Sequence, residues 1–201
     1  MPSFNLFTDT SLSTAYGGTS AFVHKTDFSD NDQDFVLYLG SPLTGRQLQA
    51  NSNPGTDNIT LTPTDTLTDW TVATEAAVGD LIEPSTPNDY MYICVTAGTT
   101  DASTEPTWTT TVGDQFNDNG VIWECYGKKH KTTEIKLATT SAGLDSATAG
   151  AALSLGTTIS SGTANKIEIH VRLTNAVNHV TNTTGKPNIT LTFNEPIETA
   201  A

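Results

Sequence analysis

Basic side chains are scarce in this sequence. It has 9 Lys and Arg residues against 22 Asp and Glu residues, which gives a net charge of −13 at pH 7. The one positive cluster, Lys128–Lys131, is short. A surface with this charge repels a phosphate backbone, so we expect no nucleic acid partner.

Long apolar runs are also missing. No stretch approaches the roughly 20 apolar residues that a membrane-spanning helix needs. Residues 1–5 carry neither the positive region nor the apolar region of a secretory signal. We therefore expect no membrane association and no export by the secretory route.

The short motifs of common enzymes are missing as well. The sequence has no G-x-S-x-G nucleophile elbow, no phosphate-binding P-loop and no G-x-G-x-x-G turn. Glu105 has no evident carboxylate partner for glycosidase chemistry. We therefore predict a protein that is not an enzyme and that uses no cofactor.

Only two cysteines are present, Cys94 and Cys125. Two ligands are too few for a zinc site. The two residues occupy matching places in two predicted strands, so their sulfur atoms could be neighbours. A disulfide would close a loop of about 30 residues and stabilise the fold by about 3 kcal/mol. Two buried thiols are the alternative, and they are the ordinary state in a reducing cytoplasm.

The composition favours strands and turns. Hydrophobic residues make up 36% of the sequence and charged residues only 15%, and Thr, Ser, Asn and Gly fill much of the rest. These polar residues are weak helix formers, and Thr favours strands. Ser141–Gly150 could form a short helical turn, but its glycines favour a loop, which is what we expect there. We predict an all-β protein.

Both outer parts of the chain alternate apolar and polar residues, as half-buried antiparallel strands do. Lys166–Leu173 is the longest such segment, with its apolar residues on one face. The other strands predicted in the outer parts are Ala21–His24, Phe35–Leu39, Asn58–Thr62, Glu134–Ala138 and Asn188–Phe193.

The middle third of the chain has a different texture, because residues 67–131 contain all three tryptophans and both cysteines. In it, Tyr90–Cys94 and Val121–Cys125 are predicted to pair as strands. We predict an antiparallel β-sandwich, Ig-like or jelly-roll-like, built from residues 1–66 and 132–201 and interrupted by a small β-module at 67–131. Such an insertion costs little, since the free energy of loop closure rises slowly with length.

One acidic segment suggests a metal site. Asp30, Asp32 and Asp34 place carboxylates at every second position, as the first ligands of a calcium loop do. The glycine that permits the sharp turn is missing, with Phe35 in its place, and no glutamate follows at the closing position. A calcium site and a solvated loop between strands both stay open as interpretations.

The aromatic residues of the middle third have two interpretations. Trp108, Tyr90, Tyr92 and Trp123 could form a face on which sugar rings stack. Alternatively they form the core of the module, since a unit of this size needs large side chains to bury enough area. The sequence alone does not decide between a glycan site and a core.

The middle third carries a distinctive set of residues: Gly79, Asp80, Tyr92, Thr96–Thr99, Glu105–Trp108, Val112, Gly113, Asn119–Trp123 and Cys125. In these residues it resembles a short repeat common in tailed-bacteriophage virion proteins, and this repeat is itself similar to small carbohydrate-binding modules of the chitin-binding kind. Thr109–Thr111 departs from that repeat, where a proline-rich loop is usual.

The outer segments carry a second set of features at Tyr38–Pro42, Gly143–Gly150, Leu153–Gly156, Ser161–Gly162, Ile169–Arg172 and Glu195–Glu198. In these features they look like a phage structural β-sandwich. Together the resemblances imply a non-enzymatic virion structural protein that decorates or joins the capsid, neck or tail surface. It would assemble in the bacterial cytoplasm as a homo-oligomer bound to other virion proteins. The alternative is a host-surface glycan-binding module displayed on the virion.

Overall fold

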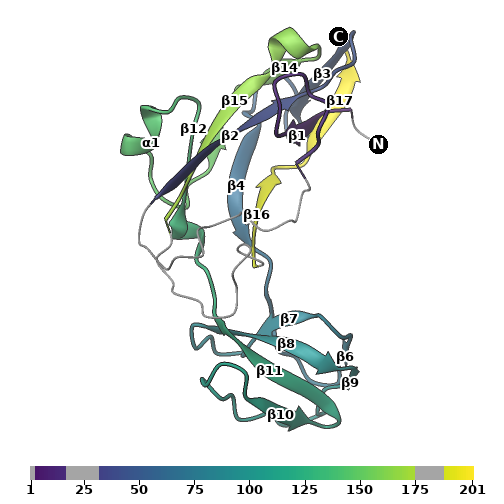
Figure 1. Cartoon of the computed structure of the whole chain (residues 1–201). Helices are drawn as coiled ribbons and strands as arrows, with labels where there is room; N and C mark the ends of the chain where they lie inside the picture. The colour runs from purple at the N-terminus through teal and green to yellow at the C-terminus, as the bar shows by residue number, and fades with distance from the viewer. Residues whose placement is uncertain (1–2, 17–31, 175–187) are drawn as a thin grey trace.

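The computed structural model describes residues 3–16, 32–174 and 188–201, so the predicted strand Ala21–His24 lies outside the described residues. The all-β prediction is confirmed, because antiparallel sheets dominate these residues and helices are few and short. The strands form a larger body from the two outer parts of the chain and a smaller one from the middle part (Figure 1).

One layer of the larger body is a four-stranded sheet in which segments from the two chain arms pair along their whole length. Its second strand begins at Gln33, two residues before the predicted strand, because Asp34 pairs in register with Arg172 of the neighbouring strand. In spatial order the strands are β1 (Asn5–Phe7), β2 (Gln33–Gly40), β15 (Ile167–Leu173) and β12 (Ile135–Ala138).

The facing layer consists of two three-stranded sheets. Each strand of one sheet is next to a strand of the other sheet along the chain. One sheet has β4 at its centre and the other has β3, and each centre pairs with a strand from the C-terminal end. The strands are β13 (Leu153–Ser154), β4 (Thr60–Asp65) and β16 (Ile189–Phe193) in one, and β14 (Thr158–Ser160), β3 (Arg46–Ala50) and β17 (Pro196–Ala200) in the other.

Strand β4 runs through Pro63, beyond the segment predicted as a strand. Ile59 N donates to Gly156 O over 2.8 Å, and Leu155 N donates to Ile59 O over 2.9 Å. The backbone N–H and C=O groups of the odd-numbered residues in this segment therefore face β13. Since β13 ends before it reaches Pro63, the missing N–H of the proline costs no ladder hydrogen bond.

Side chains from both arms of the chain form a single hydrophobic cluster between the two layers. Ile59 and Ile189 belong to two segments of identical sequence, Asn58–Thr62 and Asn188–Thr192, and lie 130 positions apart (189 − 59). They are 0% and 1% exposed and lie in this cluster. Ile169, Val171 and Leu173 of β15 are buried in it too, as the alternation predicted.

Helical structure is limited to single turns. The segment predicted as a loop, Ser141–Gly150, contains the helix α1 (Gly143–Ser146), so that prediction was wrong for one turn. Leu144, which is 0% exposed, accounts for the turn by burying its side chain. Two 3-10 turns, η1 (Thr132–Glu134) and η2 (Thr163–Asn165), complete the helical structure of the described residues.

The middle part of the chain, here called the insert, forms its own five-stranded sheet at the end of the molecule away from both termini (Figure 1). The predicted pairing of its two long strands is confirmed. In spatial order the sheet contains β10 (Gln115–Asp118), β11 (Val121–Lys128), β8 (Tyr90–Thr96), β7 (Leu81–Glu83) and β5 (Thr68–Asp69), beside a small pair of β6 (Glu75–Ala76) and β9 (Gly98–Thr99).

A tight hairpin joins β10 to β11. Asn119 and Gly120 have φ angles of 50° and 96°, which only Gly, Asn and similar residues adopt at low cost. The insert has a hydrophobic cluster separate from that of the sandwich, centred on Trp70, Tyr92 and Trp123. Each body therefore buries its own core.

Candidate functional site

The four aromatic residues predicted as a sugar-stacking face do not share one exposed surface. Tyr92 and Trp123 are 0% and 1% exposed and lie inside the cluster of the insert. Tyr90 and Trp108 are partly buried against the same cluster. Of the four rings, only those two have surface left for a ligand.

Trp108 is held by aromatic contacts and by its polar edge. Its ring centroid lies 4.5 Å from that of Tyr92 and 5.2 Å from that of Phe116. Its indole N–H donates to Glu105 Oε1 over 2.8 Å. The N–H of Trp108 is therefore used within the protein.

Glu105 anchors the loop that carries Trp108. Its carboxylate accepts hydrogen bonds from the backbone N–H of Ser85, over 2.8 Å, and from the Ser85 hydroxyl. Burial by itself raises the pKa of Glu105, but the hydrogen bonds from Ser85 and Trp108 outweigh it and lower the pKa below its ordinary value. The carboxylate is thus ionised and serves to fix this loop.

The predicted calcium ligands lie beside a guanidinium group. Asp34 accepts two hydrogen bonds of 2.8 Å from Arg172, and Asp145 accepts a third, of 2.7 Å. Asp32 accepts a hydrogen bond from the Thr174 hydroxyl over 2.7 Å. Hydrogen bonding to Arg172 lowers the pKa of Asp34.

Arg172 therefore gives the Asp34 carboxylate a positive partner within the protein. Asp30 lies outside the described residues. Within residues 3–16, 32–174 and 188–201, no group of three or more His, Cys, Asp or Glu side chains is arranged to hold a metal ion.

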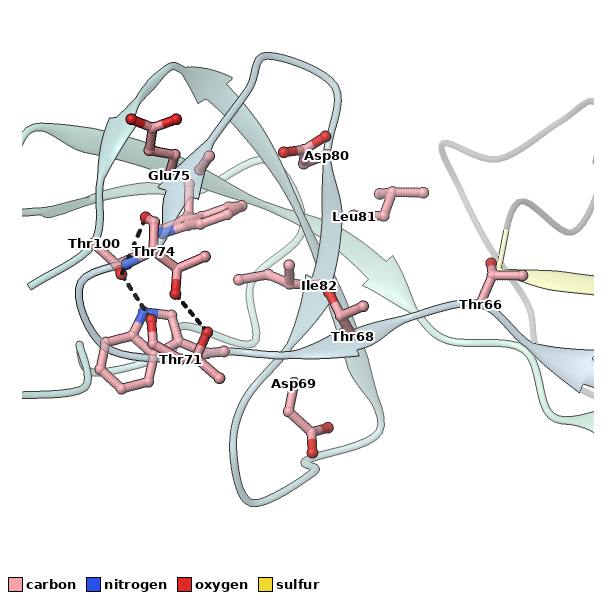
Figure 2. A pocket seen from close by; sticks show the side chains of 13 residues that line it. Thr66, Thr68, Asp69, Thr71, Thr74, Glu75, Asp80, Leu81, Ile82 and Thr100 are labelled. Carbon is pink, nitrogen blue, oxygen red and sulfur yellow. Dashed lines mark hydrogen bonds between the residues drawn. The ribbon is translucent and has the colours of Figure 1, made fainter.

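A pocket of about 730 Å³ opens on the insert, with β5, β6 and β7 around it. Its volume falls within the range of small-ligand sites. Figure 2 shows Thr71, Thr74 and Thr100 grouped on one side of it, with Glu75 on β6 and Asp80 just before β7.

Hydrogen bonds fix the threonine side of the pocket. The hydroxyls of Thr71 and Thr74 lie 2.7 Å apart, and the Thr100 hydroxyl donates to Thr71 O over 2.7 Å. Thr100 Oγ1 also accepts the backbone N–H of Thr74 over 2.9 Å (Figure 2). The hydroxyls therefore stand in set positions before any ligand arrives.

Beneath the pocket, two indoles share one buried carboxylate. Trp70 Nε1 and Trp123 Nε1 donate to Asp118 Oδ2 over 2.8 Å and 3.2 Å, and Asp101 N donates to Asp118 Oδ1 over 2.9 Å. Asp118 is 3% exposed. The indole N–H groups are satisfied internally, so the rings offer the pocket apolar carbon alone.

The pocket is acidic. Its described lining residues include Asp69, Glu75 and Asp80 and no Lys, Arg or His. Together with a net charge of −13, this lining disfavours phosphate, sulfate or carboxylate ligands.

The two chain segments that connect the sandwich to the insert are joined by Asn188, which is 0% exposed. Its side-chain amide donates to His130 O over 2.7 Å and to Asp65 Oδ1 over 3.2 Å, and its Oδ1 accepts His130 N over 3.1 Å. Thr66 N donates to Asn188 O over 2.8 Å. One residue therefore holds both connecting segments.

An ion pair adds to this junction. Lys129 Nζ lies 2.6 Å from Glu83 Oε2 of the insert and 3.6 Å from Asp65 Oδ2 of the sandwich. Burial by itself lowers the pKa of Lys129, but the two carboxylates outweigh it and raise the pKa. Lys129, one residue of the positive cluster, thus forms ion pairs with both bodies.

Both cysteines are buried free thiols. The register places Cys94 opposite Trp123 and Cys125 opposite Tyr92, so the two sulfur atoms are offset along the strands. Burial raises the pKa of both thiols, which lowers their reactivity.

The pocket was not predicted from the sequence, although Trp70 was among the aromatic residues of the middle third. Its polar wall combines threonines of residues 66–74 with the distant Thr100, and threonine is common throughout the chain. The one available signal was the clustering of Thr and acidic residues on both sides of Trp70.

Comparison with protein-family models, with curated proteins and with solved structures found no match to this chain. No helix within the described residues is long and apolar enough to cross a membrane. The candidate sites therefore rest on their own geometry.

Proposed function

We propose that this chain is a non-enzymatic structural protein of a tailed-bacteriophage virion. The sandwich attaches to the particle, on the capsid, neck or tail surface, and the insert extends from it. The protein is present in several copies, assembles in the host bacterial cytoplasm and contacts other virion proteins. The resemblance of both parts of the sequence to virion proteins suggests this assignment.

The observation that best supports the proposal is the separation of the insert from the chain ends. Both termini lie at one end of the sandwich and the insert lies at the other (Figure 1). Ser3 and Glu198 link the two terminal segments, since the Ser3 hydroxyl donates to Glu198 Oε1 over 2.8 Å. A protein of this shape can attach at one end and present the other.

The junction supports the same role. A displayed module needs a defined direction, and the buried Asn188 and the Lys129 ion pair hold the insert on the sandwich through both connecting segments. Buried, hydrogen-bonded polar contacts of this kind specify one arrangement of packed elements.

Purified particles test the proposal. Phage from a lysate that expresses this chain are separated by density gradient, and the fractions are analysed by mass spectrometry and by immunogold labelling with antibodies to the insert. We expect the chain at a fixed ratio to the major capsid protein, with label on intact particles. A chain that stays in the particle-free fractions contradicts the proposal.

A further inference from the structure

We propose that the pocket between β5, β6 and β7 binds an arginine side chain presented by a partner protein. The inference concerns the surface of the insert alone and does not depend on the virion assignment. It rests on the charge, the hydroxyl groups and the apolar surroundings of the pocket.

The charge of the lining selects a cation. Asp69, Glu75 and Asp80 contribute carboxylates to the pocket, and the described lining has no basic side chain to neutralise them. Asp69 and Glu75 are exposed and lie on opposite sides of the pocket (Figure 2). The carboxylates do not converge as metal ligands do, so an extended organic cation fits them better than a metal ion.

The polar groups match a guanidinium better than a sugar. A guanidinium has five N–H donors in one plane, and the Thr71 and Thr74 hydroxyls and the carboxylates supply acceptors. Sugar stacking requires an open aromatic face, but Trp70 and Trp123 are 7% and 1% exposed. The apolar floor that they form with Ile82 suits the methylene stem of arginine.

The rim of the pocket favours a protein over a small polyamine. Val72 and Val78 are 49% and 68% exposed. They do not line the pocket themselves, but Val72 lies between the lining residues Thr71 and Thr74, and Val78 lies between the lining residues Ala76 and Asp80. Exposed apolar side chains beside a charged pocket are the pattern of a protein interface, in which arginine is a frequent anchor.

A peptide titration tests the inference. The ¹⁵N-labelled full chain is titrated with a tetra-arginine peptide at physiological ionic strength, and a tetra-citrulline peptide serves as the uncharged control. We expect amide shifts at Thr71, Thr74 and Glu75 with the arginine peptide and none with citrulline. Shifts spread over the acidic surface, or centred on Trp108, overturn the inference.

Two variants with the same change in net charge separate the pocket from general attraction. Asp69→Asn with Glu75→Gln removes two charges from the pocket, and Glu168→Gln with Glu195→Gln removes two from the exposed surface of the sandwich. Loss of two charge-assisted contacts should weaken binding about tenfold or more in the pocket variant and under about twofold in the other. Equal losses in both variants overturn the inference.

Discussion

At the scale of single residues, the insert depends on polar groups that it buries with their partners. Asp118 is the clearest case, because its carboxylate accepts the N–H groups of Trp70, Trp123 and Asp101. It joins the β10–β11 hairpin to the strand that enters the insert and to the loop after β9. The hydrogen bonds of this one side chain therefore connect three parts of the module.

Replacing Asp118 should destabilise the insert strongly. The Asp118→Ala variant leaves buried N–H groups without an acceptor, so we expect a loss of about 3 kcal/mol in the free energy of unfolding. Asp114→Ala is the matched control, because Asp114 is exposed and near the same hairpin. This control should lower the free energy of unfolding by less than about 0.5 kcal/mol. Urea denaturation followed by tryptophan fluorescence measures both, and equal losses would contradict this role.

Glu105 should make the stability of its loop depend on pH. Its pKa is lowered in the folded protein, so its contribution is present above the ordinary pKa of glutamate, about 4.3, and is lost as the pH falls through the folded value. The melting temperatures of wild type and Glu105→Gln should differ at pH 7 and converge toward pH 3. A difference that stays constant across this range would show that the charge is not involved.

At the scale of elements, strand β16 is fixed at both ends by asparagine side chains. Asn188 precedes it and is buried, whereas Asn194 follows it and is exposed. Asn194 Oδ1 accepts Thr60 N over 2.9 Å, and its Nδ2 donates to Asn58 O over 3.0 Å. The two asparagine side chains make similar hydrogen bonds to backbone groups, but one is buried and the other is exposed. Comparing them therefore measures the effect of burial.

Asn188→Ala should therefore cost more than Asn194→Ala. Removing the buried amide deletes its two hydrogen bonds with the His130 backbone, at about 2–3 kcal/mol, while water replaces the exposed contacts of Asn194 at about 1 kcal/mol or less. Hydrogen exchange should also rise at Thr66 and His130 in the first variant only. Equal effects of the two variants would show that Asn188 is not a specific link between the bodies.

The elements that the sequence predicted well are those with a regular pattern. Eight alternating residues at Lys166–Leu173 can bury only one face. All of them except Lys166 form β15, as expected. The helical turn at α1 escaped prediction because its cause, the burial of Leu144, is tertiary. The full length of β4 also escaped prediction, because Pro63 is tolerated in the strand only where the neighbouring β13 ends.

The candidate sites were less accessible from sequence. The number and type of aromatic residues predicted either a sugar-stacking face or a hydrophobic core. Only the register of β8 with β11 determines that Tyr92 and Trp123 point inward. The pairing of Asp34 with Arg172, which lies 138 positions away (172 − 34), could not be predicted, because no local pattern indicates it. The pocket is lined by short segments from separate parts of the chain, and no local sequence pattern predicts that they lie together.

At the scale of the whole molecule, the account depends on two distant arms of the chain forming one body. β2 and β15, β4 and β16, and β3 and β17 each pair one strand from before the insert with one from after it. The insert therefore interrupts the sequence without interrupting the sandwich. Its two connecting segments leave and return at the same junction, which Asn188 holds.

An engineered disulfide tests this claim most directly. Thr62 and Thr192 are register partners on β4 and β16, and directly opposed residues in antiparallel strands have Cα atoms about 4.5–5.5 Å apart, within reach of a disulfide. The Thr62→Cys/Thr192→Cys variant should form an intramolecular cross-link on mild oxidation, detected as a shifted monomer band on a non-reducing gel and as a disulfide-linked peptide pair by mass spectrometry. Either single variant should form no such link. If the double variant oxidises only to intermolecular dimers, or stays reduced while folded, the two arms do not form one body.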